Sequence, residues 1–399
     1  MNQASEIEAA PAKPNPMPFL FSPVVDLLTF GGSALVALAM LPLGAALGIL
    51  HDDTPGWTWI GAILLIDVAH VYATGFRVYF DLAELRRRPW LYGLTPLLAF
   101  AVGVAVYSEG ELLFWSVLAY LAVFHFVRQQ YGWIALYRSR ENQLITQELR
   151  PAEPDQRGPG ITSPINRNTF DRIGWWVDAS AIYLATLYPL VYWHASPPRH
   201  FHWFAEGDFF HLPPLAATLL EPIYWLALAA YAWRSLWRGL KANRWNPGKD
   251  LVVFTTAICW YVGIISLNSD YAFTVTNVII HGVPYMVLIY WYRWHRQPRQ
   301  SKGLDAGDTG AEPTPFVTTS RWHTTAGRVS LFFGAIWVLA YAEELLWDGG
   351  SGQRHEWLFA WCGTLPEWLE TEAWLAPALA VPQITHYVLD GFIWRRSAR

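Results

Sequence analysis

Charged residues are scarce in this chain. Asp, Glu, Lys and Arg make up 15% of its 399 residues, whereas ordinary soluble domains carry about 25%. The charges occur in short clusters between long apolar runs, and 53% of all residues are hydrophobic. A soluble globular class is therefore excluded, and we expect several bilayer crossings of about 20 mostly apolar residues each.

Cysteine is almost absent as well. The two cysteines, Cys259 and Cys362, form no CxxC pattern, and Cys259 lies in an apolar run, so we expect neither a disulfide nor a cysteine-type zinc site. The net charge of −4 is too small to indicate a nucleic-acid partner. Residues 1–24 lack the basic and short apolar regions of a signal peptide. We expect them to form a disordered cytoplasmic tail.

The hydropathy pattern predicts an all-α fold, a polytopic transmembrane helix bundle that forms one domain over residues 25–399. It contains about ten apolar spans, and its 24 Trp and 19 Tyr are typical of the aromatic belts at membrane interfaces. The expected spans cover residues 27–50, 57–80, 91–107, 112–137, 170–193, 215–237, 251–267, 271–292, 326–346 and 374–394.

The loops between these spans differ in charge. Arg and Lys gather after every second span, whereas the other loops are short or acidic. The positive-inside rule then places both termini in the cytoplasm, with cytoplasmic loops at 138–168 and 293–321 and outer-face loops at 194–214 and 347–373. We expect the lipid bilayer of a bacterial inner membrane as the setting.

Four histidines lie inside these spans at a common distance from the basic end of each span. His70 precedes Asp81 by eleven residues, His125 precedes Arg138 by thirteen, His281 precedes Arg293 by twelve, and His386 precedes Arg395 by nine. The spread of four residues is roughly 6 Å along a helix. Polar side chains at such a depth are costly and face the bundle interior, so we expect the four imidazoles to form one layer.

Other polar residues join this layer one helical turn away. Carboxylates lie near two of the histidines, because Asp67 precedes His70 by three residues and Asp390 follows His386 by four. We interpret the four histidines with Asp67 and Asp390 as metal ligands, and Asp67, Asp390 and Tyr285 as catalytic groups. Amides at Gln129, Gln383 and Asn277 are expected to orient the imidazoles or a cofactor.

Imidazole and carboxylate ligands suit iron, manganese or zinc. Non-haem iron, with one or two ions, is the cofactor we expect, and zinc or haem b stays open. A structural interpretation also stays open, since a single intramembrane histidine is often only a hydrogen bond between helices. Asp178 is expected to make a polar contact between helices, and the loop histidines match no zinc template.

Two segments carry a resemblance, HFVRQQYG at 125–132 and HYVLDG at 386–391. Their arrangement resembles bacterial polytopic membrane oxygenases whose metal ligands are histidines on several helices, such as the Brp/Blh-type carotene-cleaving dioxygenases. The chain differs from membrane fatty-acid hydroxylases and desaturases, because it has no HxxHH or HxxxH box. The resemblance implies a membrane oxygenase and assigns no individual residue.

The leading hypothesis is a metal-dependent membrane oxidoreductase, a non-haem iron oxygenase that acts on a lipid-like, apolar small-molecule substrate with a possible electron-donor protein. A haem b electron-transfer protein is the second hypothesis, since two histidines on different helices can hold one haem. A proton- or metal-coupled transporter and a subunit of a larger membrane complex are the others.

Overall fold

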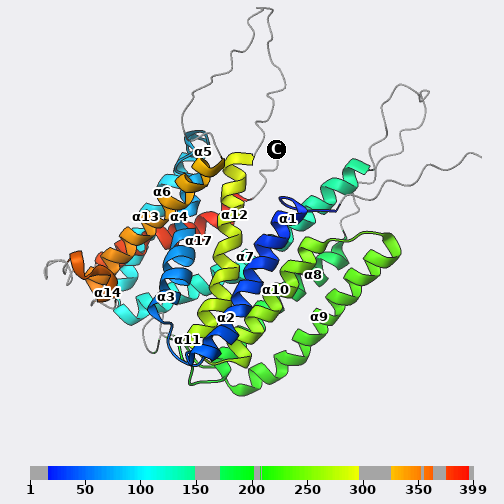
Figure 1. The fold of residues 1–399 in the computed structure, drawn as a ribbon, viewed down its shortest axis with the longest axis horizontal. Coiled ribbons are helices and arrows are strands. Elements are labelled where there is room, and N and C mark those ends of the chain that lie inside the picture. The colour runs from blue at the N-terminus through cyan, green and yellow to red at the C-terminus, as the bar shows by residue number, and fades with distance from the viewer. Residues whose placement is uncertain are drawn as a thin grey trace, which may run out of the picture.

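The computed structural model describes residues 17–148, 171–201, 207, 209–295, 325–351, 355–362 and 374–394. Within these ranges every regular element is helical (Figure 1). The helices and helical turns are α1 (Pro23–Asp26), η1 (Leu27–Gly32), α2 (Ser33–Leu47), α3 (Gly56–Thr58), η2 (Trp59–Val68), α4 (Ala69–Arg77), α5 (Leu82–Arg87), α6 (Pro89–Ser108), α7 (Glu111–Glu148), α8 (Arg172–Ala195), α9 (Pro214–Ala242), α10 (Pro247–Trp260), η4 (Tyr261–Ser266), α11 (Asp270–Phe273), η5 (Thr274–Val278), α12 (Ile279–His295), α13 (Thr325–Ser351), α14 (Glu356–Phe359), η7 (Ala360–Cys362), α16 (Leu375–Leu379) and α17 (Val381–Ile393).

Eight helices in the described part of the chain are long and apolar enough to cross a bilayer, and they indicate an integral membrane protein. They are Pro23–Ala46, Gly56–Arg77, Pro89–Ser108, Glu111–Gln147, Pro214–Ala242, Pro247–Ser266, Asp270–His295 and Thr325–Gly349. The outer helices expose large apolar side chains, among them Leu35, Leu97 and Leu226. In water such surfaces would associate, whereas lipid covers them without cost.

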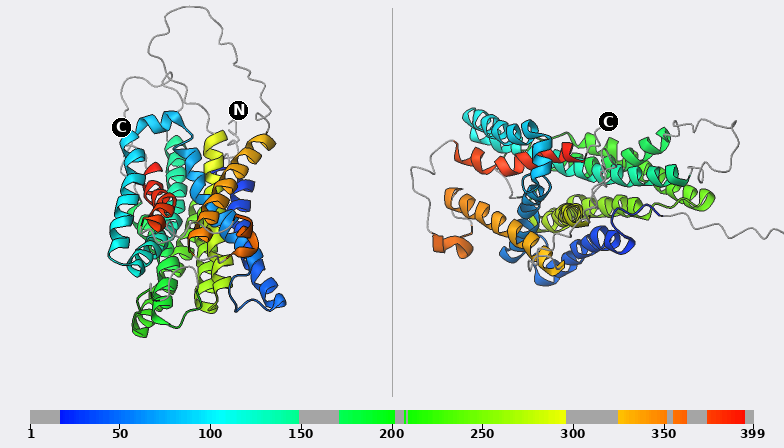
Figure 2. Two further views of the ribbon diagram at one scale, coloured as in Figure 1. Left: turned by 90° about the vertical axis from the view of Figure 1, so that its left-hand side faces the viewer. Right: turned by 90° about the horizontal axis from the view of Figure 1, so that it is seen from above.

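The expected fifth and tenth spans are not among these eight helices. The fifth corresponds to α8, which packs against α9 and α10. The tenth is divided between the short helices α16 and α17, and α17 has 13 residues, about 20 Å at 1.5 Å per residue. Figures 1 and 2 show α17 in red, running across the long helices rather than alongside them.

Several boundaries differ from the expected loops. Helix α7 continues to Glu148, so residues 138–148 of the segment expected as a loop are helical. The expected loop at 347–373 begins inside α13 and includes α14 and η7. Residues 1–16, 149–170, 296–324 and 363–373 lie outside the described residues, so the first part of the tail and most of both cytoplasmic loops remain predictions. The expected tail at 1–24 is too long, because Leu20 and Phe21 donate backbone hydrogen bonds to Asp26 and α1 begins at Pro23.

Helix α12 lies at the centre of the bundle. In the continuous span Asp270–His295, which ends with α12, 78% of the most apolar stretch is buried, against 17% for the outer helix that begins at Pro214. Its Ile280 belongs to one apolar cluster with Trp260, and its Ile289 belongs to another with Ala69. Because His281 is on this helix between the two clusters, burial of the apolar neighbours carries the imidazole into the protein interior.

Two of the histidine helices are preceded by π-helical segments, which are wider than an α-helix and are frequent at functional sites. η2 leads into α4 and its His70, and η5 leads into α12 and its His281. The two helices approach closely at Gly282, where a Cβ atom would lie 2.6 Å from Ile66 Cγ2 and 3.0 Å from the Ile66 carbonyl oxygen. A glycine is required here by the close approach.

The basic residues gather at one end of the bundle. In Figure 1 the upper end carries α5 with Arg86 and Arg87 and the C-terminal end of α12 with Arg293. The opposite end carries α3 and α11, next to the acidic residues Asp52 and Asp270. The charge asymmetry read from the loops is therefore present in three dimensions, and the side of the membrane on which each end lies remains a prediction.

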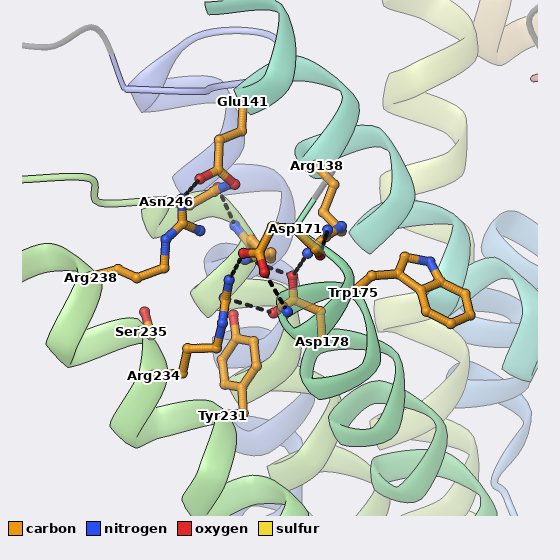
Figure 3. A network of polar contacts seen from close by, with 12 residues as sticks. Arg138, Glu141, Asp171, Trp175, Asp178, Tyr231, Arg234, Ser235, Arg238 and Asn246 are labelled. Atoms are coloured by element: carbon orange, nitrogen blue, oxygen red, sulfur yellow. Dashed lines mark hydrogen bonds and ion pairs between the residues drawn. The ribbon is translucent and has the colours of Figure 1, made fainter. Parts of the chain in front are cut away.

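Asp178 joins four helices near the basic end (Figure 3). Its side chain is 1% exposed and lies 2.5 Å from Arg138, 2.8 Å from Lys249 and 3.8 Å from Arg234. These residues come from α8, α7, α10 and α9. Asp178 therefore makes a polar contact between helices, as its isolated position in an apolar run predicts.

Candidate metal centre

The four intramembrane histidines converge in one cluster. Their ring centroids are 4.6 to 5.0 Å apart for four of the pairs and 6.2 Å apart for His70 and His125. All four residues are at most 2% exposed. Four separate helical segments therefore bring the four predicted imidazoles to one place inside the protein, and their role as ligands remains a prediction.

One of the four histidines lies on a different kind of helix than expected. His70, His125 and His281 lie on long helices that run between the two ends of the bundle, as predicted. His386 lies on the short helix α17, which runs across the bundle (Figure 2). Its distance from Arg395 along the sequence therefore does not measure its depth.

The Nε2 atoms meet in two pairs. His70 Nε2 lies 3.2 Å from His281 Nε2, and His125 Nε2 lies 3.0 Å from His386 Nε2. Nitrogen ligands that share a tetrahedral metal ion at about 2.0–2.1 Å are separated by about 3.3 Å. The observed spacing is thus that of neighbouring ligands around a single ion, and it is also that of a hydrogen bond between two imidazoles.

The Nδ1 atoms of three rings face oxygen atoms. His70 Nδ1 contacts the backbone carbonyl oxygen of Asp67, and His386 Nδ1 lies 2.7 Å from Thr74 Oγ1. His125 Nδ1 lies 3.9 Å from Asp390 Oδ2. A metal-binding histidine characteristically donates its other N–H to a carbonyl, carboxylate or water. Nδ1 donation by His70 and His386 leaves the lone pair of Nε2 in these two rings directed into the cluster. The Nδ1 atom of His125 faces the Asp390 carboxylate beyond hydrogen-bond distance.

Lone pairs that face each other at 3.0 Å repel, so this tautomer needs a cation or a proton between the Nε2 atoms. Two overlapping sets of ligand atoms could hold a metal ion in the cluster. The first set is His70, His125 and His386, and the second is Asp67, His70 and His281; within each set the atoms lie within 4.8 Å of one another. Either set has the donor types that iron, manganese or zinc accept.

Tyr285 reaches the cluster through Thr74. Its hydroxyl group lies 2.9 Å from Thr74 Oγ1, which in turn is 2.7 Å from His386 Nδ1. All three side chains are buried. The chain of contacts Tyr285–Thr74–His386 fixes the ring orientation and provides positions between which a proton can be exchanged. Thr74 had not been predicted, although its place four residues after His70 puts both side chains on one helix face.

The two predicted carboxylates differ in their contacts. Asp67 Oδ1 lies 3.7 Å from His70 Nδ1 and makes no hydrogen bond to the described residues. Asp390 accepts a hydrogen bond from Trp394 at 2.9 Å and faces His125 rather than His386, its neighbour in sequence. Asp390 therefore lies behind an imidazole, and Asp67 is the carboxylate in a potential ligand set.

The three amides also differ. Gln129 donates to the backbone carbonyl oxygen of His281 at 2.8 Å, next to the carbonyl that Pro284 leaves without an amide partner in α12. Gln383 donates to Glu343 at 3.3 Å, away from the histidines. Asn277 bonds within its own helix, to the carbonyl oxygen of Phe273 at 3.1 Å. Of the three amides, Gln129 is therefore the one that hydrogen-bonds to the backbone of a cluster histidine within the described residues.

Two aromatic rings cover the cluster. Phe126 stacks on His281 with ring centroids 3.8 Å apart, and Tyr387 stacks on His125 at 4.6 Å. Phe126 follows His125 in the sequence and Tyr387 follows His386. Neither aromatic residue had been predicted as part of the site. Both rings also form part of the wall of a large cavity.

This cavity has a volume of about 570 Å³ and extends from the cluster towards the acidic end of the bundle. Its size falls within the range of small-molecule sites. It reaches the cluster at Asp67, Phe126 and Tyr387, and its far end includes Asp53 and Glu111. These three side chains border the cavity on one side and contact the imidazoles on the other.

The carboxylates of α13 are the most informative residues that the sequence interpretation missed. Glu343 is 4% exposed and accepts hydrogen bonds from Trp347 and Gln383, each at 3.3 Å. Glu344 lines the cavity. Both lie inside a predicted span, where any carboxylate points to function, but no histidine is nearby in the sequence to draw attention to them.

The fold and the cluster together define a class, a helical membrane protein with a buried centre of four histidines that could hold a metal ion. No protein-family model, curated protein or solved structure matches this chain in sequence or fold.

Proposed function

We propose that this chain is an integral-membrane metalloprotein that binds non-haem iron at His70, His125, His281 and His386. The observation that carries the proposal is the orientation of the rings: the Nε2 atoms converge, and three Nδ1 atoms face oxygen atoms behind them. A cluster built only to join helices would not need every ring to present the same nitrogen inwards.

The proposed reaction is the oxidation of a lipid-like, apolar substrate by dioxygen. Bound iron would supply the capacity to activate dioxygen, which no amino-acid side chain has. A dioxygenase places both oxygen atoms in its products and needs no further reductant. A monooxygenase takes two electrons and two protons from outside and releases one water, and a donor protein would then be required.

The chain's own residues have separate tasks in this proposal. Thr74 holds the ring of His386 in place by a hydrogen bond, and Asp390 offers a negative charge to the ring of His125. Tyr285 holds a proton at its hydroxyl group within reach of Thr74 Oγ1. Asp67 is placed either to bind the ion or to accept a proton from a molecule in the cavity. The aromatic side chains of the cavity exclude water and accommodate an apolar body.

Haem b fits this geometry less well. Two axial imidazoles on one iron have their nitrogens about 4 Å apart, twice a metal–nitrogen bond, with an open plane between them for the macrocycle. Here the paired Nε2 atoms are 3.0 and 3.2 Å apart, and the other two rings occupy the space around each pair.

Elemental analysis of the purified protein tests the proposal. We expect about one or two iron atoms per chain with no Soret absorption band, and most of this metal should be lost in His70→Ala, His125→Ala, His281→Ala and His386→Ala. His194→Ala is the matched control, because His194 is also a buried histidine but bonds to Tyr120 and Leu190 outside the cluster. Unchanged metal content in all four cluster variants would refute the proposal.

Metal analysis, an absorption spectrum and a proteoliposome transport assay together separate the alternatives. A Soret band with one iron per chain would support the haem hypothesis. Stoichiometric zinc would exclude the oxygenase, because zinc has no redox chemistry. A transporter would move metal or protons across proteoliposome membranes. A complex subunit whose histidines only join helices would contain no metal after purification.

A further inference from the structure

The cavity beside the metal centre has an unusual combination of wall residues. Its described lining includes five tryptophans and four phenylalanines, and it contains carboxylates but no lysine or arginine. The carboxylates are Asp53, Asp67, Glu111, Asp270, Glu344 and Asp348. Such a wall repels an anionic ligand and favours a ligand that carries positive charge.

Some of these carboxylates are already engaged in the fold. Asp270 accepts hydrogen bonds from the backbone and side chain of Thr54, at 3.1 and 2.6 Å. Asp348 accepts one from the backbone of His355 at 2.6 Å. Glu111 accepts one from the indole of Trp115 at 3.2 Å. These bonds explain why three of the carboxylates are present without any ligand.

Glu344 is different. It makes no hydrogen bond or ion pair within the part of the chain that the structure describes, and it lines the cavity one helical turn before Trp347 and Asp348, which line it too. The neighbouring Glu343, which accepts hydrogen bonds from the wall residues Trp347 and Gln383, is 4% exposed, and its Oε2 atom has no hydrogen-bond partner among the described residues. A partly buried carboxylate with a second one next to it favours a cation in the cavity.

Aromatic rings surround this position. Trp347 packs against Trp115 with ring centroids 5.7 Å apart, and both line the cavity with Trp59 and Tyr387. Indole and phenol faces attract ammonium groups, most strongly where water is excluded. The volume of about 570 Å³ is far more than a metal ion or proton needs and fits an organic molecule.

We propose that the cavity binds an organic cation, an amine or quaternary ammonium group that carries an apolar body, with Glu344 as its counter-charge. The aromatic walls hold the apolar body and place it against Asp67, Phe126 and Tyr387, on the cavity side of the histidine cluster. That this ligand is the substrate of the metal centre rests on the proposed function. Its binding does not.

The test uses three probes of one shape and different charge on the full chain in lipid nanodiscs. They are benzyltrimethylammonium, its carbon isostere neopentylbenzene, and the anion benzylsulfonate. Binding is followed by the fluorescence of the wall tryptophans. We expect the wild-type protein to bind the ammonium probe at least about tenfold more tightly than the isostere, a difference of about 1.4 kcal/mol, and to bind the sulfonate least.

Glu344→Gln should remove most of this preference while it leaves binding of the neutral isostere unchanged. Glu109→Gln is the matched control, since Glu109 is an exposed carboxylate on the loop between α6 and α7 and lies outside the cavity wall. The control should keep the tenfold preference. Equal binding of the ammonium probe and the isostere by the wild-type protein, or an unchanged preference in Glu344→Gln, would overturn the inference.

Metal content measured on the same samples keeps the two proposals apart. A protein without metal that still prefers the ammonium probe would refute the metal centre and leave the cavity site intact. A metal-loaded protein without charge preference would refute the cavity inference alone. A folded Glu344→Gln variant is recognised by its wild-type binding of neopentylbenzene, so a loss of preference cannot be confused with unfolding.

Discussion

Gly282 offers the sharpest test of how the histidine cluster is assembled. It follows His281 on α12 and faces Ile66, which precedes Asp67 and His70 on the neighbouring segment. The Gly282→Ala substitution adds a Cβ atom 2.6 Å from Ile66 Cγ2 and 3.0 Å from the Ile66 carbonyl oxygen. Carbon atoms in good contact are about 3.5–4.0 Å apart, so the two segments must separate by roughly 1 Å.

This displacement acts directly on the pair His70–His281, whose Nε2 atoms are 3.2 Å apart. Metal–ligand distances tolerate changes of about 0.2 Å, so a separation of roughly 1 Å should weaken metal binding strongly. Overpacking of this kind costs about 1–3 kcal/mol of folding stability. We therefore expect Gly282→Ala to lose most of its metal and to unfold at a lower temperature than the wild-type protein.

The assay is elemental analysis together with thermal unfolding, on metal-loaded and metal-free samples. Gly334→Ala is the control, because Gly334 is a helical glycine of α13 whose added Cβ would meet nothing within 4 Å. It should keep both the metal and the stability of the wild-type protein. Full metal content in a Gly282→Ala variant would show that the close approach of α12 and η2 does not position the ligands.

Three further substitutions test other parts of the structure. Thr74→Val removes the hydroxyl group between Tyr285 and His386 and should weaken metal binding by about 10- to 100-fold in a chelator competition, whereas Thr95→Val, whose hydroxyl bonds only its own helix, should not. Asp178→Asn leaves Arg138 and Lys249 without their shared carboxylate and should cost about 3–5 kcal/mol in a denaturant titration; a loss below about 1 kcal/mol would contradict the role of this contact. Burial alone would raise the pKa of Glu84 at the basic end, but the hydrogen bond from Tyr92 and the charges of Arg77 and Arg87 outweigh it and lower that pKa. Because the folded pKa is below the unfolded value of about 4.3, this contribution is present above about pH 4.3 and is lost as the pH falls through the folded pKa; the decline in melting temperature below pH 4.3 should be shallower in Glu84→Gln, and an identical decline would exclude this role.

The helical class could be predicted from the sequence because apolar runs of membrane length have few alternatives. The pairing of His70 with Asp67, three residues away on one helix, also follows from helical periodicity. The span count could not be predicted as reliably. The segment 374–394 is apolar throughout, but α16 and α17 divide it, and packing against α4, α6 and α7 lays it across the bundle.

Contacts between segments that are distant in the sequence were the part of the site that could least be predicted. Asp390 faces His125 rather than the histidine four residues before it, because the side chains meet between α17 and α7. Glu343 reaches Gln383 across 40 residues of sequence. Helical periodicity orders residues within one helix, and it contains no information about which face of another helix will meet them.

The placement of His386 has a consequence for how the protein is made. Three of the imidazoles lie on helices that leave the ribosome well before α17, and the fourth is on the last helix that the structure describes. The bundle can therefore insert and assemble with its central histidines still lacking a partner. Docking of α17 is the step that completes the histidine cluster, so the cluster forms only after α17 has been translated and cannot guide the insertion of the earlier segments.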